Sequence, residues 1–252
     1  MNTRFNPTCN GDPDSGILHI GHAALIYLNA EVAKQSGGRF VLRFDDNQAY
    51  WVDKLGRPYI GRVISQIKRE IEWMGVEWQE ETRHSENASL IDIVLTVMNL
   101  GFFMARDPII GYPISHVPNL TRFNSPQYPY APYLTAEVVI LDAISQIDTV
   151  IVGEELMSRF SLYCYLCEAL KNPIPTHYHV PRLMERGTQH ELAPVSKTVG
   201  NFKIKRYMDN GMNTSDFKYS VASHYLHDLS HGWSLDNVAK EPVIDVNFNG
   251  NV

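Results

Sequence analysis

The sequence predicts an α/β fold built on a Rossmann-like parallel β-sheet. Short apolar runs of strand length alternate with longer runs that have helical spacing, an order typical of a parallel sheet with crossover helices. Gly21 stands where the first buried run turns into the first helix. The length of 252 residues is enough for a sizeable core in a single domain with small additions.

The elements of the first half follow from the spacing of apolar residues and from the Gly, Asp and Pro residues between them. In chain order we expect a strand over 3–9, a loop over 10–16, a helix over 20–34, a strand over 39–44, and helices over 59–74 and 87–101.

Periodicity is lost from Asp107 to Pro132, where prolines and aromatic residues take over. A second half then resumes the alternation, with strands predicted over 135–141, 149–152 and 177–183, a helix over 154–170, and a last helix over 200–209. These changes divide the chain into a first core half (1–106), an insertion (107–132), a second core half (133–199) and a C-terminal extension (200–252).

Composition favours a cytoplasmic location. No run of about 18 apolar residues is present, so we expect no membrane helix, and the first residues lack the apolar segment of a secretory signal. Three cysteines without an obvious pairing suit a reducing compartment. Cys164 and Cys167 have the spacing of metal ligands, but they stand in an apolar helical run with only Cys9 elsewhere, so we expect neither structural zinc nor another protein-held metal.

The most informative motif is the tetrad His19-Ile20-Gly21-His22. A helix that begins here would offer free backbone N–H groups to phosphate oxygens, and Gly21 would allow close approach of a nucleotide. Two imidazoles could donate to the charge that develops on a phosphate. The alternative is that the two histidines are ordinary core or surface residues.

A second segment favours the nucleotide interpretation. Ser196 and Lys197 lie in a polar stretch after an apolar run, and together they offer a mobile ammonium beside a hydroxyl. Such a lysine suits the binding of phosphates, so the two segments together predict an ATP site formed by His19, Gly21, His22, Ser196 and Lys197.

These residues resemble the two signatures of class I aminoacyl-tRNA synthetases, the HIGH motif and the lysine loop written KMSKS, and more narrowly those of the glutamyl/glutaminyl branch. The resemblance extends through Thr3–Pro7, Leu42–Asp46, Glu72–Val76 and Asp142–Glu155, in the family's order, over about residues 3–206. It implies the HUP-type core of that class, with His19, His22 and Lys197 in catalytic roles and with ATP and its Mg²⁺ as cofactors.

The resemblance also implies an amino-acid site. In the family an arginine of the first strand and an acidic residue after the second hold the carboxylate and amino groups, and these roles would fall on Arg4 and Asp45. A pocket tyrosine falls on Leu134 or, after a shift of one residue, on the neighbouring Tyr133. Val152 stands where glutamyl enzymes carry an arginine, and a valine cannot neutralise a buried carboxylate, so glutamate is disfavoured as the substrate.

Three departures from the family set the remaining expectations. The insertion and the region after the lysine loop are short, so we expect no anticodon domain, and tRNA binding should be weakened further by a net charge of −6. The lysine loop keeps one ammonium, which Arg182 or Lys203 could supplement. The loop before the tetrad carries two extra carboxylates, Asp12 and Asp14, which we expect to point into solvent.

The sequence therefore predicts an ATP-dependent ligase that adenylates a glutamine- or glutamate-type amino acid and passes it to tRNA or another acceptor. The alternative is a non-catalytic paralogue that binds nucleotide or a protein partner through the same core.

Overall fold

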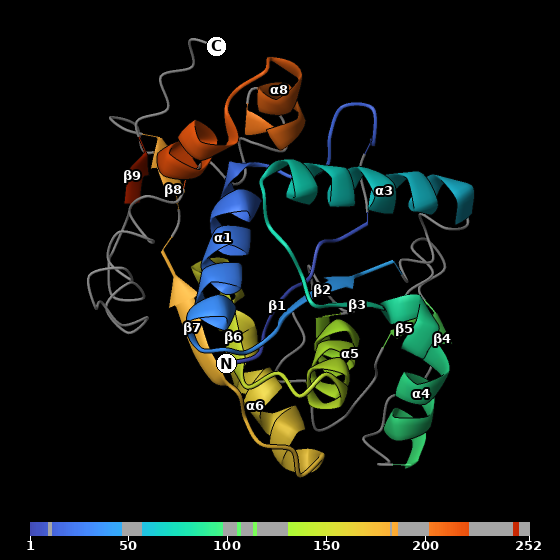
Figure 1. The fold of residues 1–252 in the computed structure, drawn as a ribbon. Coiled ribbons are helices and arrows are strands. Elements are labelled where there is room, and N and C mark those ends of the chain that lie inside the picture. The colour runs from blue at the N-terminus through green and yellow to red at the C-terminus, as the bar shows by residue number, and fades with distance from the viewer. Residues whose placement is uncertain are drawn as a thin grey trace.

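The computed structural model describes residues 1–9, 12–46, 57–97, 105–106, 113–114, 131–181, 183–185, 202–221 and 244–246. Its centre is a set of parallel strands with helices on both faces (Figure 1). The strands of the first half are β1 (Thr3–Phe5), β2 (Phe40–Phe44) and β3 (Glu80–Arg83), and all of them pair in parallel in the order β1-β2-β3. The second half contributes the parallel pair β6 (Thr149–Gly153) and β7 (Thr176–Val180).

The two parallel sheets adjoin along β1 and β6. The carbonyl of Asn2 accepts hydrogen bonds from the backbone N–H groups of Asp148 and Thr149, at 3.3 and 3.2 Å. The strands therefore stand in the order β3-β2-β1-β6-β7, and the order reverses between β1 and β6. In open α/β sheets a ligand crevice forms at such a reversal, beyond the carboxyl ends of the strands.

Helices connect the strands in the sequence that parallel pairing demands. They are α1 (Ile20–Gln35), α3 (Arg57–Trp73), α4 (His84–Val97), α5 (Ala131–Ile144), the 3-10 helix η2 (Glu154–Arg159) and α6 (Phe160–Ala169). Peripheral pieces are the antiparallel pair β4 (Ala105–Arg106) and β5 (Pro113–Ile114), the parallel pair β8 (Leu183–Glu185) and β9 (Ile244–Val246), α8 (Ile204–Asp209) and a helix over 214–221.

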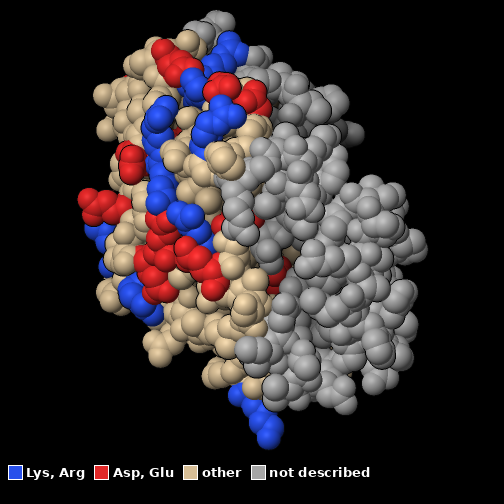
Figure 2. All heavy atoms as spheres, turned by 90° about the vertical axis from the view of Figure 1, so that its right-hand side faces the viewer, with Lys and Arg blue, Asp and Glu red and all other residues tan. Residues whose placement is uncertain are grey.

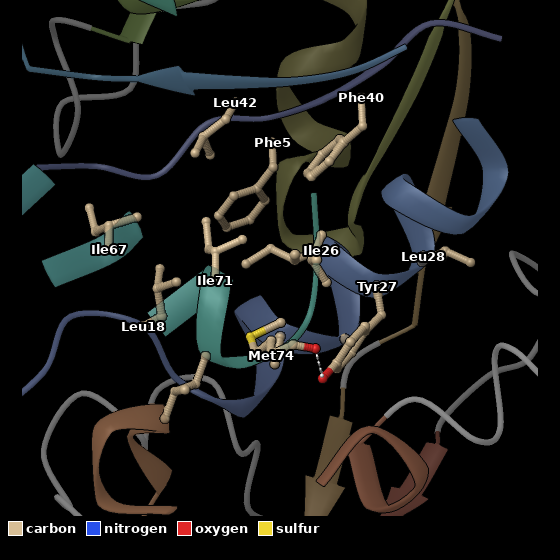
Figure 3. Close-up of a cluster of buried hydrophobic side chains, with 14 of the residues drawn as sticks. Phe5, Leu18, Ile26, Tyr27, Leu28, Phe40, Leu42, Ile67, Ile71 and Met74 are labelled. Atoms are coloured by element: carbon tan, nitrogen blue, oxygen red, sulfur yellow. Dashed lines mark hydrogen bonds between the residues drawn. The ribbon is translucent and has the colours of Figure 1, made fainter. Parts of the chain in front are cut away.

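Alternate residues of β2 separate the two faces of the sheet. Phe40, Leu42 and Phe44 belong to a core formed with α1 and α3, whereas Val41 packs with Val150 of β6 in a separate cluster. Figure 3 shows the first core, in which Phe5, Ile26 and Ile71 fill the space between strand and helices. One face thus carries α1 and α3, and the other carries α5, which packs against α6.

α1 is held to the sheet by polar contacts as well as by apolar packing. The hydroxyl of Thr3 donates to the carbonyl of Asn29 at 2.8 Å, and the Asn29 amide donates to the carbonyl of Ile151 at 3.2 Å. Asn29 is fully buried, so these bonds fix α1 against both β1 and β6. They set the position of the tetrad at the start of the helix.

The predicted α/β fold with a parallel sheet is confirmed, and one predicted element is wrong. Residues 135–141, predicted as a strand, lie inside α5. The error arose because this short apolar run is buried on several sides, and burial on all sides removes the periodicity that separates a buried helix from a buried strand. The predicted helix over 154–170 begins as the 3-10 helix η2, and β3 has no counterpart among the predicted strands.

No described helix is both long enough and apolar enough to cross a membrane. The described residues likewise contain no group of three or more His, Cys, Asp or Glu side chains placed to hold a metal ion. Cys164 and Cys167 lie on α6, where Cys167 is part of the buried core.

Candidate active site at the sheet reversal

The tetrad lies where the sequence predicts it, at the start of α1 beside the strand reversal. His19 precedes the first helical residue, and its ring stacks on that of His22 with centroids 3.6 Å apart. The backbone N–H of His19 donates to Nδ1 of His22 at 3.4 Å. A neutral His22 therefore carries its proton on Nε2, which makes that atom a hydrogen-bond donor.

Gly21 is required by the stacked histidines. A Cβ at this position would lie 3.2 Å from two atoms of the His19 ring, which is tighter than ordinary contact. The residue thus permits the close packing of His19 against the helix start.

Glu70, on α3, fixes the segment that leads into the tetrad. Its carboxylate accepts hydrogen bonds from the backbone N–H groups of Ile17 and Leu18, at 3.1 and 2.8 Å, and from the Gln66 amide at 2.9 Å. Burial raises the pKa of this carboxyl, and the hydrogen bonds and nearby Lys203 act against the rise. Sequence reasoning missed Glu70, because its backbone partners Ile17 and Leu18 lie more than fifty positions away along the chain.

A cavity of about 680 Å³ opens beside the tetrad. Its wall combines the ends of β1 and β6 with the start of α1 and includes His19, His22, Gly153 and Lys203. The Lys203 ammonium donates to the hydroxyl of Ser15 and to the carbonyl of Gly16, at 2.8 and 3.0 Å. These bonds hold Lys203 in the wall of this cavity. Asp12 and Asp14 are exposed, as the sequence predicts.

Part of the predicted ATP site lies outside the described residues. This applies to Ser196, Lys197 and the whole lysine loop, and also to Arg182. The structure therefore brings together His19, Gly21 and His22, while the placement of Ser196 and Lys197 remains a prediction.

A second cavity, of about 240 Å³, lies on the α5 side of the sheet. It is lined by four of the residues predicted to hold an amino acid, Arg4, Asp45, Leu134 and Val152. The fifth, Tyr133, lies on α5, with a side chain outside the described part of the chain. The two cavities share Arg4, Val152 and four further residues, so they meet at the ends of β1 and β6.

Arg4 belongs to a buried ionic cluster. Its Nε and Nη2 donate to the two carboxylate oxygens of Asp142 at 2.9 and 3.1 Å, and Arg43 donates to the same carboxylate at 2.6 Å. The Tyr163 hydroxyl donates to Asp142 at 2.8 Å. The two guanidinium groups lower the pKa of Asp142 to about 2 despite its burial. Two cations thus share one anion in this cluster, which leaves positive charge beside the cavity.

The two acidic residues after β2 have different environments. Asp46 accepts from the backbone N–H and the hydroxyl of Ser85, at 2.9 and 2.7 Å, and so anchors the start of α4. Asp45 faces the smaller cavity, with Oδ1 3.9 Å from Nδ1 of His84. Of the two, only Asp45 lines that cavity, and its role toward an amino acid stays a prediction.

Sequence reasoning missed several polar side chains of the smaller cavity: His84, Arg159, Tyr163, His177 and His179. Burial lowers the pKa of His177, whose Nδ1 lies 2.9 Å from the carbonyl of Pro175, and also lowers that of His179. Both rings are thus held mainly neutral near pH 7. Their alternation along β7 was the available signal, since residues two apart in a strand share a face.

Comparison with known proteins finds a family model that matches the first part of the chain. Residues 1–100 match the family described as tRNA synthetases class I (E and Q), catalytic domain. Among curated proteins, the chain is 38% identical over 89 residues to a glutamine–tRNA ligase of Idiomarina loihiensis, and 40% identical over 87 residues to one of Pseudoalteromonas atlantica. Each match covers 34% of this chain and 13% of the relative, so the chain aligns with a small part of these proteins.

Solved structures extend the likeness of the fold to nearly the whole chain. A glutamate tRNA ligase from Elizabethkingia meningosepticum, in complex with its amino acid, matches with a TM-score of 0.65 and 17% identity, covering 99% of this chain and 67% of that one. A tyrosyl-tRNA synthetase from Archaeoglobus fulgidus, complexed with L-tyrosine, matches with a TM-score of 0.55 and 15% identity, covering 77% and 59%. At these identities the likeness establishes the fold.

Proposed function

We propose that this chain, whose residues 1–100 belong to the catalytic-domain family of class I tRNA synthetases for glutamate and glutamine, is a ligase that forms an aminoacyl-adenylate from ATP. The observation that carries the proposal is the meeting of two cavities at the strand reversal, one beside the tetrad and one lined by Arg4 and Asp45. Adenylation requires the carboxylate of an amino acid to reach the α-phosphate of ATP. Two contiguous cavities at a sheet reversal suit this reaction.

ATP is assigned to the larger cavity. Its walls present the imidazoles of His19 and His22 and the ammonium of Lys203, all of which can donate to phosphate oxygens. We assign Ser196 and Lys197 to the β- and γ-phosphates, as the resemblance implies. Mg²⁺ would arrive with the triphosphate and neutralise part of its charge.

The amino acid is assigned to the smaller cavity, where charges of both signs are already in place. Arg4 and the surplus positive charge of its cluster suit an α-carboxylate, and Asp45 suits an α-ammonium. The carboxylate of the amino acid then attacks the α-phosphate in line and pyrophosphate leaves. No protein nucleophile is needed, because orientation and charge neutralisation supply the rate.

The side-chain end of the cavity supports an uncharged, glutamine-type substrate. Val152 and Leu134 line it with apolar surface, and Val152 is half-buried at the junction of the two cavities. His177 and His179 are mainly neutral. They can therefore hydrogen-bond a substrate side chain, but they do not supply a full positive charge to balance the side-chain carboxylate of glutamate. Glutamate would therefore be disfavoured.

The acceptor of the activated group is proposed to be tRNA or another molecule. Figure 2 shows basic and acidic side chains intermingled on the described part of one face. In the described part of the chain, Lys68 and Arg83 both pair with Glu81. Cations that are already paired give less attraction for a phosphate backbone, so this surface supports only weak tRNA binding.

Amino-acid-dependent exchange of pyrophosphate into ATP tests the proposal directly. The full chain would be assayed with each natural amino acid, with and without bulk tRNA, and glutamine should give the fastest exchange. His22→Ala and Lys197→Ala should each lower the exchange rate about tenfold or more, the scale expected for loss of a donor to a developing charge.

Lys34→Ala is the matched control, because Lys34 is exposed at the far end of α1. It should leave the exchange rate and the melting temperature unchanged. Absence of exchange with every amino acid, with ATP binding retained, would instead support the non-catalytic paralogue that binds nucleotide.

A further inference from the structure

His84 is the one described residue for which both ring nitrogens are buried without a hydrogen-bond partner among the described residues. It is the first residue of α4, directly after β3, and its side chain is 2% exposed. The ring lines the smaller cavity. Buried polar groups are nearly always hydrogen-bonded, so a buried imidazole at a cavity wall indicates that something polar completes it there.

The surroundings of His84 are acidic. Nδ1 lies 3.6 Å from Oε2 of Glu137 and 3.9 Å from Oδ1 of Asp45. Glu137 lies on α5 and is 1% exposed, whereas Asp45 is 16% exposed at the cavity. These separations are longer than ordinary hydrogen bonds, so the imidazole is close to both carboxylates without a direct bond to either.

We infer that His84 is a specificity-determining residue that binds the ammonium group of the substrate together with Asp45. This inference rests on the proposed function and assigns a residue that the sequence motifs do not indicate. An ammonium carries three N–H donors and a carboxylate can accept from only some of them in one place. The imidazole of His84 supplies a further acceptor, and the carboxylate of Glu137 lies 3.6 Å from its Nδ1.

The arrangement of the cavity supports this orientation. His84 and Asp45 follow β3 and β2, while Arg4 is part of β1 beside the reversal. The carboxylates beside His84 (the acidic wall) and the cluster of Arg4 and Arg43 are therefore displaced from each other along the sheet edge. An α-amino acid placed with its carboxylate at Arg4, near the larger cavity, would direct its ammonium toward Asp45 and His84.

A bound water between His84 and the two carboxylates is the alternative occupant. Water would satisfy the same ring nitrogen without favouring ligands that carry an amine. The two interpretations differ in one measurable property, which is the discrimination between ligands with and without the amino group.

Two analogues of glutamine separate these groups. Glutaminol keeps the amine and lacks the carboxylate, and glutaramic acid keeps the carboxylate and lacks the amine. Calorimetry with the full chain would measure the binding of each to the wild type, to His84→Leu and to His84→Gln. Leucine removes the acceptor at similar size, and glutamine restores an acceptor.

We expect His84→Leu to weaken glutaminol binding about tenfold or more, the scale of a hydrogen bond to a charged group, and to leave glutaramic acid within about twofold. His84→Gln should recover most of the glutaminol affinity. Equal weakening of both analogues, or no change in either, would overturn the inference and favour a structural role or a water.

The outcomes for the wild type distinguish this inference from the proposed function. Failure of the wild type to bind glutaminol would overturn the role of His84. Binding of glutaminol with the expected loss in His84→Leu, but no pyrophosphate exchange with any amino acid, would uphold the ammonium site and overturn the ligase activity alone.

Discussion

Replacement of Glu70 by alanine should destabilise the protein more than any exposed substitution on the same helix. Glu70 is fully buried and accepts three hydrogen bonds, from the backbone N–H groups of Ile17 and Leu18 and from the Gln66 amide. Its side chain thereby joins α3 to the segment that begins the tetrad.

The magnitude follows from the donors that would be left without an acceptor. Leu18 is fully buried and Gln66 is 5% exposed, and each unsatisfied buried donor costs about 1–3 kcal/mol. The half-buried Ile17 N–H can find water. Burial raises the pKa of Glu70 because a buried charge is unfavourable. Removal of that charge therefore offsets part of the destabilisation caused by the unsatisfied donors. We expect a net loss of about 2–3 kcal/mol in the free energy of unfolding.

Glu70→Gln should cost about half as much. The bonds from Ile17 and Gln66 both use Oε1, and a glutamine oxygen can keep them. Its amide nitrogen would then face the N–H of Leu18, which leaves one buried donor unsatisfied. Glu72→Ala is the matched control, because Glu72 lies on the same helix and is exposed, and it should change stability by less than about 0.5 kcal/mol.

Urea unfolding of the four proteins measures these differences. A loss of 2–3 kcal/mol moves the midpoint by about 1 M for the slope expected of a domain of this size. Glu70→Ala should also slow pyrophosphate exchange under conditions where it stays folded, because Leu18 directly precedes His19. Equal midpoints for Glu70→Ala and Glu72→Ala would refute the reasoning, since the three hydrogen bonds would then contribute no stability.

Three further predictions concern specificity, tRNA and pH. Val152→Arg places a cation where the two cavities meet and should raise exchange with glutamate relative to glutamine, and an unchanged ratio would show that residue 152 lies away from the substrate side chain. Filter binding should find weak tRNA affinity that falls steeply between low and physiological salt, and sub-micromolar affinity at physiological salt would contradict the surface argument. Burial lowers the pKa of His177, so folding favours its neutral form. The stability that this gives is fully present above about pH 6.5, the pKa of an unperturbed histidine, and is lost as pH falls through the lower pKa of the folded state. Melting temperatures measured from pH 7.5 to 5 should therefore fall less in His177→Gln than in the wild type, and parallel curves would count against this assignment.

The sequence by itself determined the parallel α/β fold, the helix over the tetrad and the two strands that flank the reversal. It did so because the apolar spacing in α3 is regular, because β2 and β6 are short apolar runs of strand length, and because the tetrad at the start of α1 is a contiguous segment. It also predicted Arg4 and Asp45 as site residues, and both line the smaller cavity. It failed for α5, where burial on several sides erased the helical period.

Only the tertiary structure decided which side chains surround those residues. Arg4 and Asp142 are 138 positions apart, Leu18 and Glu70 are 52 apart, and His84 approaches Glu137 from another helix. Such pairs are created when strands align and helices pack, and no local spacing in the chain encodes them. The motifs therefore specify the chemistry at the strand ends, whereas packing specifies the charges that surround it: the shared anion of Arg4 and Arg43, and the acidic wall at His84.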